Sequence, residues 1–477
     1  MSSPSALLDR LEAAKREFHP SSQCHTAKLL TTLGRQNFPD AQSLIRFHEA
    51  LLFFRAYPAT EEIRRLAAGL LATFQDRINR LRNSGSDLDP FEEPDVSGIS
   101  GTAFSAIFTY DIARWLAARH PASVTIDWDS TDPTLLGPLL RRLHPGFNED
   151  LLVEANIPYM DWFRSAKKGS ATDLQWLIAS IQKFPIAPED RAELYAGAKI
   201  AIRWDLGHGS LTRSNIHLPG LRKFLYHHAP LLRRSEISLA TELASPRIAT
   251  RKISRARGEQ FLNLARETSA MRYRELHGFT FGDPAHVIHA QLGRGLEVFV
   301  AGVPSEHRLP LRAYHCGMYF KNGVPIGYIE CLTLFDRMEV GFNLYYTFRE
   351  GETAWIYARL LHLFRQLLGV NYFAVDPYQI GLHNPEAIDS GAFWFYRKLG
   401  FRPTDPKVAK LLASEENKLR ADPNYRTRPT TLRRLATGWM IYETPTAKPG
   451  KWDNFEVRRL AMRQRSARSQ RAAFTLV

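Results

Sequence analysis

Cysteine is scarce in this chain of 477 residues. The three cysteines, at positions 24, 316 and 331, are too few and too widely spaced for a disulfide framework or for the C-x-x-C pairs of zinc and redox sites. Long apolar runs are missing too, since none approaches the roughly 20 residues that a membrane-spanning helix needs. The N-terminus has an amphipathic helical pattern and not the order of an export signal. These absences predict a cytoplasmic protein with no membrane span and no metal site.

Acidic residues are in deficit. Lys and Arg together number 63 against 49 for Asp and Glu, which leaves a net charge of +14. The excess is concentrated in two segments: residues 245–258 hold five basic residues and no acid, and residues 451–477 hold seven basic residues against two acids. A positive balance of this size favours anionic partners, among them nucleic acid and phosphorylated cofactors. Nucleic acid held by these basic segments is therefore one candidate partner.

In residues 1–230 the apolar side chains mostly recur with the period of an α-helix, and no catalytic motif is recognisable. They predict a helical N-terminal domain of unknown role. Helices are expected, among other places, at 102–119, 133–143, 172–184 and 188–200. Residues 231–258, with their basic stretch, predict a linker.

The period changes after the linker, and residues 259–445 predict a second domain. Residues 285–292, 296–303, 312–320, 324–334 and 338–347 read as successive strands, and Asn322-Gly323 is a strong signal for a hairpin turn. A helix over 353–368, a buried strand over 370–375, a helix over 384–399 and a late strand over 439–443 complete the order. We predict an α/β (α+β) fold in which the helical domain precedes a mixed sheet flanked by helices, followed by a basic tail over 446–477.

The start of the helix at 353–368 is a candidate anion site. A strand runs into the glycine-bearing loop around Gly351, and the helix follows directly. The first backbone N–H groups of a helix have no acceptor within the helix, and the helix dipole adds partial positive charge. A pyrophosphate is a typical ligand of such a turn. Glycine allows the backbone to approach it closely.

The segment Asp389–Phe401, DSGAFWFYRKLGF, carries a family resemblance. It resembles the late helix of the GNAT-type (N-acetyltransferase-like) acyltransferase superfamily, N-x-x-A-x-x-x-Y-x-K-x-G-F, with Asp389 at the Asn position. The other motif residues fall in register: Ala392, Tyr396, Lys398, Gly400 and Phe401. The order of strands and helices is also similar to that family over residues 255–443, and the N-terminal half lies outside the resemblance.

The resemblance implies transfer of an acyl group from acetyl-CoA or another acyl-CoA to the amine of a small molecule or a protein. It implies that Tyr396 is the general acid that protonates the leaving thiolate, a role that suits a phenol because it keeps its proton at neutral pH. It also implies that the donor is held by the fourth strand of the fold and by the phosphate loop. The donor-binding residues are then Leu344, Tyr345, Tyr346, Arg349, Gly351, Thr353 and Ala354.

A carboxylate is the expected base, because the amine must lose a proton before or during attack. Glu339, at the start of the strand over 338–347, is the chosen candidate. Two further carboxylates are candidates: Glu330 lies on the neighbouring strand over 324–334, and Asp376 follows the end of the strand over 370–375. A strand-end salt bridge is the alternative role for each of these carboxylates.

The loop departs from the family pattern Q/R-x-x-G-x-G/A, because in register with Gly351 this chain has Phe348 at the first position and Thr353 at the last. Two glutamates, Glu350 and Glu352, fall where phosphates would lie, and like charges there weaken binding unless they point away. Two alternatives therefore stay open: transfer of an acyl or aminoacyl group from a carrier protein or a tRNA, and a non-catalytic GNAT-like fold that binds nucleic acid. The direction of the two glutamate side chains distinguishes these alternatives from the CoA hypothesis.

Overall fold

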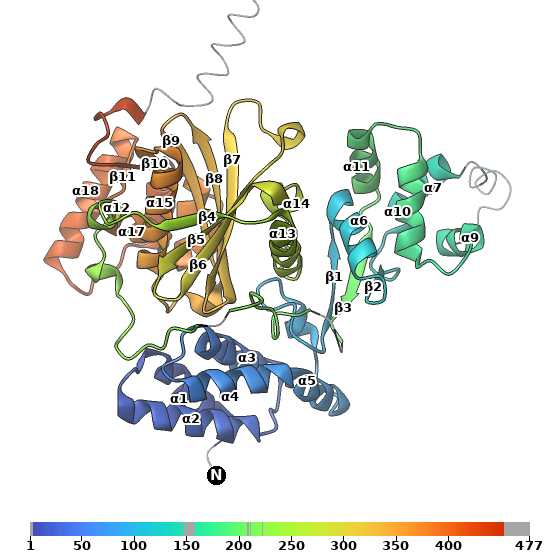
Figure 1. Ribbon diagram of the computed structural model, residues 1–477, viewed down its shortest axis with the longest axis horizontal. Helices are drawn as coiled ribbons and strands as arrows, with labels where there is room; N and C mark the ends of the chain where they lie inside the picture. The colour runs from blue at the N-terminus through green and yellow to red at the C-terminus, as the bar shows by residue number, and fades with distance from the viewer. Residues whose placement is uncertain are drawn as a thin grey trace, which may run out of the picture.

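The computed structural model describes residues 3–452 except 145, 147–157, 208, 210 and 222 (Figure 1). Most of the expected basic tail, residues 453–477, lies outside the described residues. No helix within the described part of the chain is long and apolar enough to cross a membrane. The fold is mixed α/β, with a helical N-terminal region followed by a large mixed sheet flanked by helices, which confirms the predicted fold class.

The chain begins with a bundle of helices that packs beneath one end of the sheet (Figure 1). Its central helix is buried on almost every side, since 12 of its 16 residues are buried, among them the polar His48 and Glu49. Its N-cap is Asp40, whose carboxylate accepts the backbone N–H of Ser43 at 2.7 Å. The elements are α1 (Pro4–Ala13), η1 (Ala14–Arg16), α2 (Pro20–Gly34), α3 (Ala41–Ala56), α4 (Glu61–Ala72), α5 (Phe74–Asn83) and η2 (Asp89–Glu92).

A small α/β unit follows, and it corrects the prediction of one helical domain over 1–230. Its three-stranded antiparallel sheet has the order β1-β3-β2, and it has a hydrophobic core of its own. The helix expected at 102–119 begins instead with a strand, because a short apolar run does not distinguish strand from helix by its period. The elements are β1 (Ala103–Ile107), α6 (Tyr110–Arg119), β2 (Val124–Ile126), α7 (Pro133–Leu143), α9 (Tyr159–Ala166), α10 (Asp173–Lys183), α11 (Pro188–Gly197) and β3 (Ala201–Asp205).

The segment predicted as a basic linker is ordered and belongs to the second domain. It contains η3 (Arg234–Glu236), α12 (Leu239–Leu243) and β4 (Ala249–Lys252), which pairs antiparallel with β5 at the edge of the large sheet. Apolar residues between the charges explain the difference, since Leu239, Leu243, Ile248 and Ile253 are all buried. The charged side chains of β4 stay exposed, as an edge strand permits.

The large sheet has nine strands in the order β11-β12-β10-β9-β8-β7-β6-β5-β4. The predicted meander is confirmed: β5 to β9 pair antiparallel with their neighbours, and Asn322 and Gly323 both adopt positive φ in the β7–β8 turn. The parallel pair of the sheet is β9 with β10. The strands are β5 (Val287–Gly293), β6 (Leu296–Gly302), β7 (Ala313–Lys321), β8 (Val324–Leu334), β9 (Arg337–Leu344), β10 (Tyr372–Val375), β11 (Arg402–Pro403) and β12 (Met440–Glu443).

Helices cover the large sheet, and the predicted helix over 353–368 is confirmed, ending at Gly369 in the left-handed conformation. The helix expected over 384–399 is broken in two, because Gly391 has φ +67° and interrupts the helical path. The elements are α13 (Arg255–Ala270), α14 (His277–Thr280), η4 (Pro284–His286), η5 (Ser305–His307), η6 (Tyr346–Phe348), α15 (Thr353–Leu368), η7 (Pro377–Ile380), α16 (Pro385–Asp389), α17 (Ala392–Lys398), α18 (Pro406–Ala421) and α19 (Pro429–Leu435).

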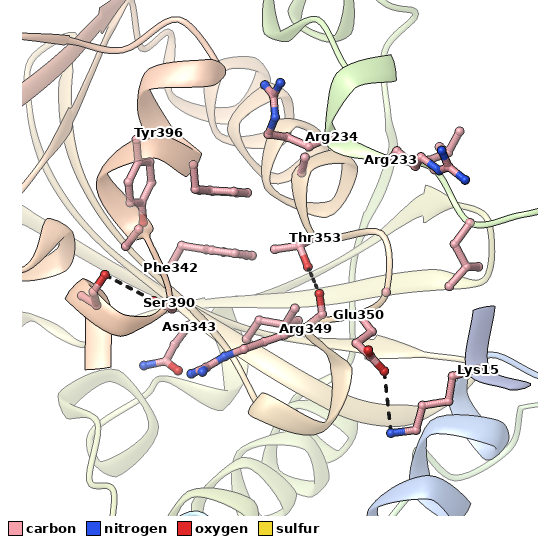
Figure 2. A pocket seen from close by; sticks show the side chains of 18 of the residues that line it. Lys15, Arg233, Arg234, Phe342, Asn343, Arg349, Glu350, Thr353, Ser390 and Tyr396 are labelled. Carbon is pink, nitrogen blue, oxygen red and sulfur yellow. Dashed lines mark hydrogen bonds and ion pairs between the residues drawn. The ribbon is translucent and has the colours of Figure 1, made fainter. Parts of the chain in front are cut away.

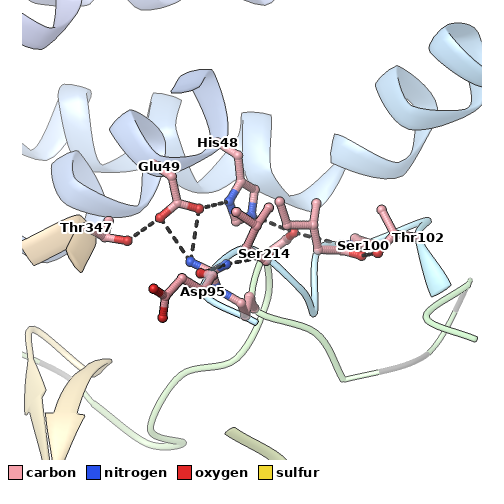
Figure 3. A network of polar contacts seen from close by, with 10 residues as sticks. His48, Glu49, Asp95, Ser100, Thr102, Ser214 and Thr347 are labelled. Atoms are coloured by element: carbon pink, nitrogen blue, oxygen red, sulfur yellow. Dashed lines mark hydrogen bonds and ion pairs between the residues drawn. The ribbon is translucent and has the colours of Figure 1, made fainter. Parts of the chain in front are cut away.

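A buried polar network joins the helical bundle to the end of β9 (Figure 3). One guanidinium nitrogen of Arg213 lies 3.0 and 2.9 Å from the two carboxylate oxygens of Glu49, and Thr347 donates its hydroxyl to the same carboxylate. On the other side, His48 contacts Glu49 at 3.0 Å and Ser214 at 2.9 Å. The network therefore connects α3 and the chain leaving the small α/β unit to η6, which follows β9.

Two buried histidines in the bundle and its neighbouring loop make stability depend on pH. Burial lowers the pKa of His48 to about 4 and that of His227 to about 3. Both are neutral in the folded protein at pH 5, whereas the unfolded chain takes up their protons below about pH 6.5, so stability rises with pH across this window and falls on acidification. We expect the free energy of unfolding to drop by about 2 kcal/mol for each histidine between pH 7 and pH 5.

Denaturant titrations at the two pH values measure this drop. The variant His48→Gln keeps a hydrogen-bonding side chain that does not titrate, and it should reduce the difference between pH 7 and pH 5 by about 2 kcal/mol. An unchanged difference in this variant would contradict the assignment.

Candidate functional site

A cavity of about 770 Å³ lies where β9 ends, where α15 begins and beside α17 (Figure 2). Segments far away in the sequence close it: η1 of the N-terminal bundle and residues 230–234 in front of α12. Six of the residues predicted to hold or act on a donor line this cavity. They are Leu344, Arg349, Gly351, Thr353, Ala354 and Tyr396.

The strand β9 has an open edge facing this cavity. Its pairing with β10 ends at Glu339 opposite Ala374, whereas its pairing with β8 continues to Leu344. The N–H of Tyr345 donates to Ile326 of the β8 side at 2.9 Å. Because the backbone N–H and C=O groups of successive residues in a strand point to opposite edges, those of Phe342 and Leu344 point toward the open edge. An extended ligand lying in the gap between β9 and β10 could form backbone hydrogen bonds there.

The N-terminus of α15 forms a second wall. The loop before it is tightly packed: a Cβ on Gly351 would lie 2.5 Å from the hydroxyl oxygen of Tyr57, so glycine is required at this position. Thr353, the first residue of α15, donates its hydroxyl to the Arg349 carbonyl at 3.1 Å. The backbone N–H groups of Thr353 and Ala354 have no acceptor within the helix, and both residues line the cavity. An anion is the ligand that this end of the helix favours.

The two loop glutamates do not block this wall. Glu352 is fully buried and turns away from the cavity, where Lys321 at 3.0 Å and Arg294 at 2.7 Å bind its carboxylate, and these cations hold the pKa of Glu352 below its usual value against the effect of burial. Glu350 does line the cavity, but Arg16 binds it at 2.6 Å and Lys15 lies at 3.8 Å. Glu352 thus anchors the loop, and Glu350 draws two cations to the cavity wall.

Tyr396 stands on the wall formed by α17 (Figure 2). Its ring packs edge-on against Tyr357 and Phe401, with centroid distances of 5.6 and 5.7 Å. Its hydroxyl makes no hydrogen bond to the residues that the structure describes. Burial raises the pKa of Tyr396 well above its usual value. The phenol therefore holds its proton at neutral pH and is available to donate it within the cavity.

Tyr345 and Tyr346 are not part of the cavity lining, which corrects their predicted position. Tyr345 lies under the guanidinium of Arg272, whose carbon is 4.0 Å from the ring centroid. Tyr346 faces the network of Glu49 and Arg213, and burial, reinforced by the Glu49 carboxylate, raises the pKa of its phenol. The chain turns into η6 after Leu344, and the sequence pattern did not reveal this turn.

Glu339, predicted as the base, lines a different cavity of about 480 Å³ nearer the start of β9. Arg312 binds its carboxylate at 2.6 Å and Arg337 lies at 3.8 Å, so Glu339 forms the strand-end salt bridge that was its alternative role. Glu330 lines the same cavity, and within the described part of the chain the Tyr314 hydroxyl is its one side-chain hydrogen-bond donor. Burial raises the pKa of Glu330. Gln379 lines both cavities, which therefore adjoin.

Sequence reasoning missed the cations that reach the first cavity from outside residues 259–445. Lys15 and Arg16 come from η1, and Arg233 and Arg234 come from the segment before α12. Each is one of a pair of adjacent basic residues, which was the one available signal. Such pairs are common on solvated surfaces, so the sequence alone does not single these two out.

No protein-family model, no curated protein and no solved structure matches this chain. The candidate function therefore rests on the geometry and chemistry of the two adjoining cavities.

Proposed function

We propose that this protein is an acyltransferase that moves an acyl group from a CoA thioester to an amine. The observation that carries the proposal is one cavity bordered by the open edge of β9, the N-terminus of α15 and the phenol of Tyr396. These are the three elements that the resemblance of residues 255–443 to the GNAT-type superfamily implies for donor binding and proton donation. Tyr396 follows the start of α15 by more than 40 residues, and its position on the same cavity as β9 and α15 supports the proposal.

The donor's anionic end suits the helix terminus. Pyrophosphate oxygens accept the N–H groups at the start of α15, where the dipole adds positive charge. Arg349, on the same loop, adds a cation, although Glu386 binds it in the structure. The amides of the pantetheine arm can then pair with the open edge of β9 near Leu344, in the way that an added strand would. This path places the thioester between β9 and α17.

The reaction needs one proton donor and one proton acceptor. The amine nitrogen attacks the thioester carbonyl carbon, the C–N bond forms and the C–S bond breaks. The departing thiolate takes the proton of the Tyr396 phenol, and the nitrogen gives its proton to a carboxylate. The phenol then regains a proton from solvent and the carboxylic acid releases one to solvent, so atoms and charges balance over the cycle. A phenol with a raised pKa is protonated at the start of each cycle.

Glu330 is the carboxylate that fits the role of proton acceptor better than Glu339. No arginine among the described residues forms an ion pair with it, and its raised pKa makes it a stronger base than an exposed carboxylate. Asp376 also lines the second cavity, whose described lining holds three carboxylates, Glu330, Glu339 and Asp376, against two cations, Arg312 and Arg337. The acceptor then enters through the second cavity, which adjoins the donor cavity at Gln379.

Calorimetric titration with acetyl-CoA tests the donor site directly. We expect the full-length protein to bind it, and we expect Gly351→Asp to weaken binding about tenfold or more, because the new carboxylate lies beside the donor phosphates and its Cβ displaces Tyr57. Gly351→Ala separates the two causes, since it keeps the displacement without the charge and should weaken binding less.

Gly69→Asp is the matched control for this experiment. Gly69 lies on the exposed face of α4 with nothing within 4 Å of a Cβ, so the same change there should leave binding unchanged. If wild-type protein binds no acyl-CoA at millimolar concentration, the proposed function is wrong.

A further inference from the structure

The donor cavity carries more positive charge than a single phosphate group or a pyrophosphate at the helix end requires. Of its lining residues that the structure describes, two are carboxylates, Glu350 and Glu386. Five are cations, namely Lys15, Arg16, Arg233, Arg234 and Arg349. Three of these cations have a carboxylate partner, since Glu350 binds Lys15 and Arg16 and Glu386 binds Arg349. Arg233 and Arg234 form no ion pair within the described residues.

The segment that carries these two arginines is fixed across the cavity. The N–H of Leu232 points to a carboxylate oxygen of Glu352, the N-cap of α15, at 3.4 Å. Arg234 donates to the carbonyl of Lys398, the last residue of α17, at 2.7 Å. The segment therefore bridges the two helices that border the donor cavity. Figure 2 shows Arg233 and Arg234 above Thr353, with Lys15 and Glu350 below it.

Two unpaired cations at the rim of a phosphate site favour a second anionic group at a distance from the first. We propose that Arg233 and Arg234 hold the 3′-phosphate of CoA, so that the segment in front of α12 selects a donor with a complete phosphorylated nucleotide. The inference rests on the proposed function and deepens it. Guanidinium groups suit a phosphate monoester because they donate several hydrogen bonds while keeping their charge. A carrier protein's phosphopantetheine has no such group and leaves the two arginines unused.

Calorimetry with three probes tests the inference: CoA, 3′-dephospho-CoA and 4′-phosphopantetheine. For the wild-type protein we expect CoA to bind about 10- to 100-fold more tightly than 3′-dephospho-CoA, the range that charge-assisted hydrogen bonds produce. The double variant Arg233→Ala/Arg234→Ala should bind CoA no more tightly than it binds 3′-dephospho-CoA. Its affinity for 3′-dephospho-CoA should equal that of the wild-type protein.

The control is Arg433→Ala/Arg434→Ala, which removes an adjacent pair of exposed arginines on α19 outside the cavity lining. This control should still prefer CoA over 3′-dephospho-CoA. That result would exclude the loss of two positive charges from the protein as the sole cause. The single variant Arg233→Ala, at an exposed position, keeps the test valid if the double variant does not fold. Equal binding of CoA and 3′-dephospho-CoA, or of CoA and phosphopantetheine, by the wild type overturns this inference and leaves the proposed function standing. Binding of none of the three overturns both.

Discussion

Tyr396→Phe is expected to lower the turnover rate by about 10²–10⁴-fold, the range that a single general acid contributes. The change removes only the hydroxyl and keeps the ring that packs between Tyr357 and Phe401. The affinity for CoA should barely change, because backbone groups and cations hold the donor in the proposed arrangement. The loss should therefore appear in kcat and not in the dissociation constant of the donor.

The measurement has two parts. A screen of amines with acetyl-CoA identifies an acceptor, with release of the free thiol of CoA as the readout. Calorimetry then measures donor binding by the wild-type protein and by Tyr396→Phe. Tyr378→Phe is the matched control, because this tyrosine is 54 % exposed and lies outside both cavities. If Tyr396→Phe keeps full turnover while CoA still binds, the donor site stands and the assignment of the acid is wrong.

Arg213→Met is expected to lower the free energy of unfolding by about 3–5 kcal/mol, the cost of breaking a buried ion pair by removing one partner. The side chains of Arg213 and Glu49 are 1 % and 7 % exposed, so the carboxylate is left without its cation and without water. That cation also lowers the pKa of Glu49 against the effect of burial. Because Thr347 belongs to the same network, the variant should also loosen the turn after β9 that borders the donor cavity.

Denaturant titration measures the loss, and two further variants show its cause. Arg65→Ala breaks an ion pair whose side chains are 72 % and 52 % exposed, and it should change stability by no more than about 0.5 kcal/mol. The double variant Glu49→Gln/Arg213→Met removes the buried charge altogether and should recover part of the loss. A loss below about 1 kcal/mol in Arg213→Met would show that water reaches Glu49.

The sequence predicted those helices, strands and turns whose signals are short patterns of neighbouring residues. The Asn322-Gly323 turn needs positive φ at two successive positions, and both residues have it, so the β7–β8 hairpin could be placed from the sequence. The helix Thr353–Leu368 has an apolar period and a terminal Gly369, and it begins and ends where expected. The motif around Tyr396 was visible for the same reason, because its residues are spaced along one short segment.

Elements that depend on distant contacts escaped prediction. The exposed and charged strand β4 is a strand only because β5 offers it a partner. The bundle of α1 to α5 shares one core with the large sheet, while the small α/β unit has its own, and no composition change marks that division. Glu352 reads as a charge facing the phosphate site until the structure places Lys321 and Arg294 against it.

The candidate site likewise has features that the local sequence predicts and features that only the tertiary structure decides. The strand, the glycine loop, the helix start and the tyrosine follow from the order of residues, since backbone geometry and helix dipoles are local properties. Burial, charge pairing and the choice of base are not local, because each depends on which side chains the fold brings within a few ångströms. The tertiary structure therefore separated Glu339 from the first cavity, left Glu330 as the candidate base, and brought Lys15 and Arg233 from outside residues 259–445 to that cavity.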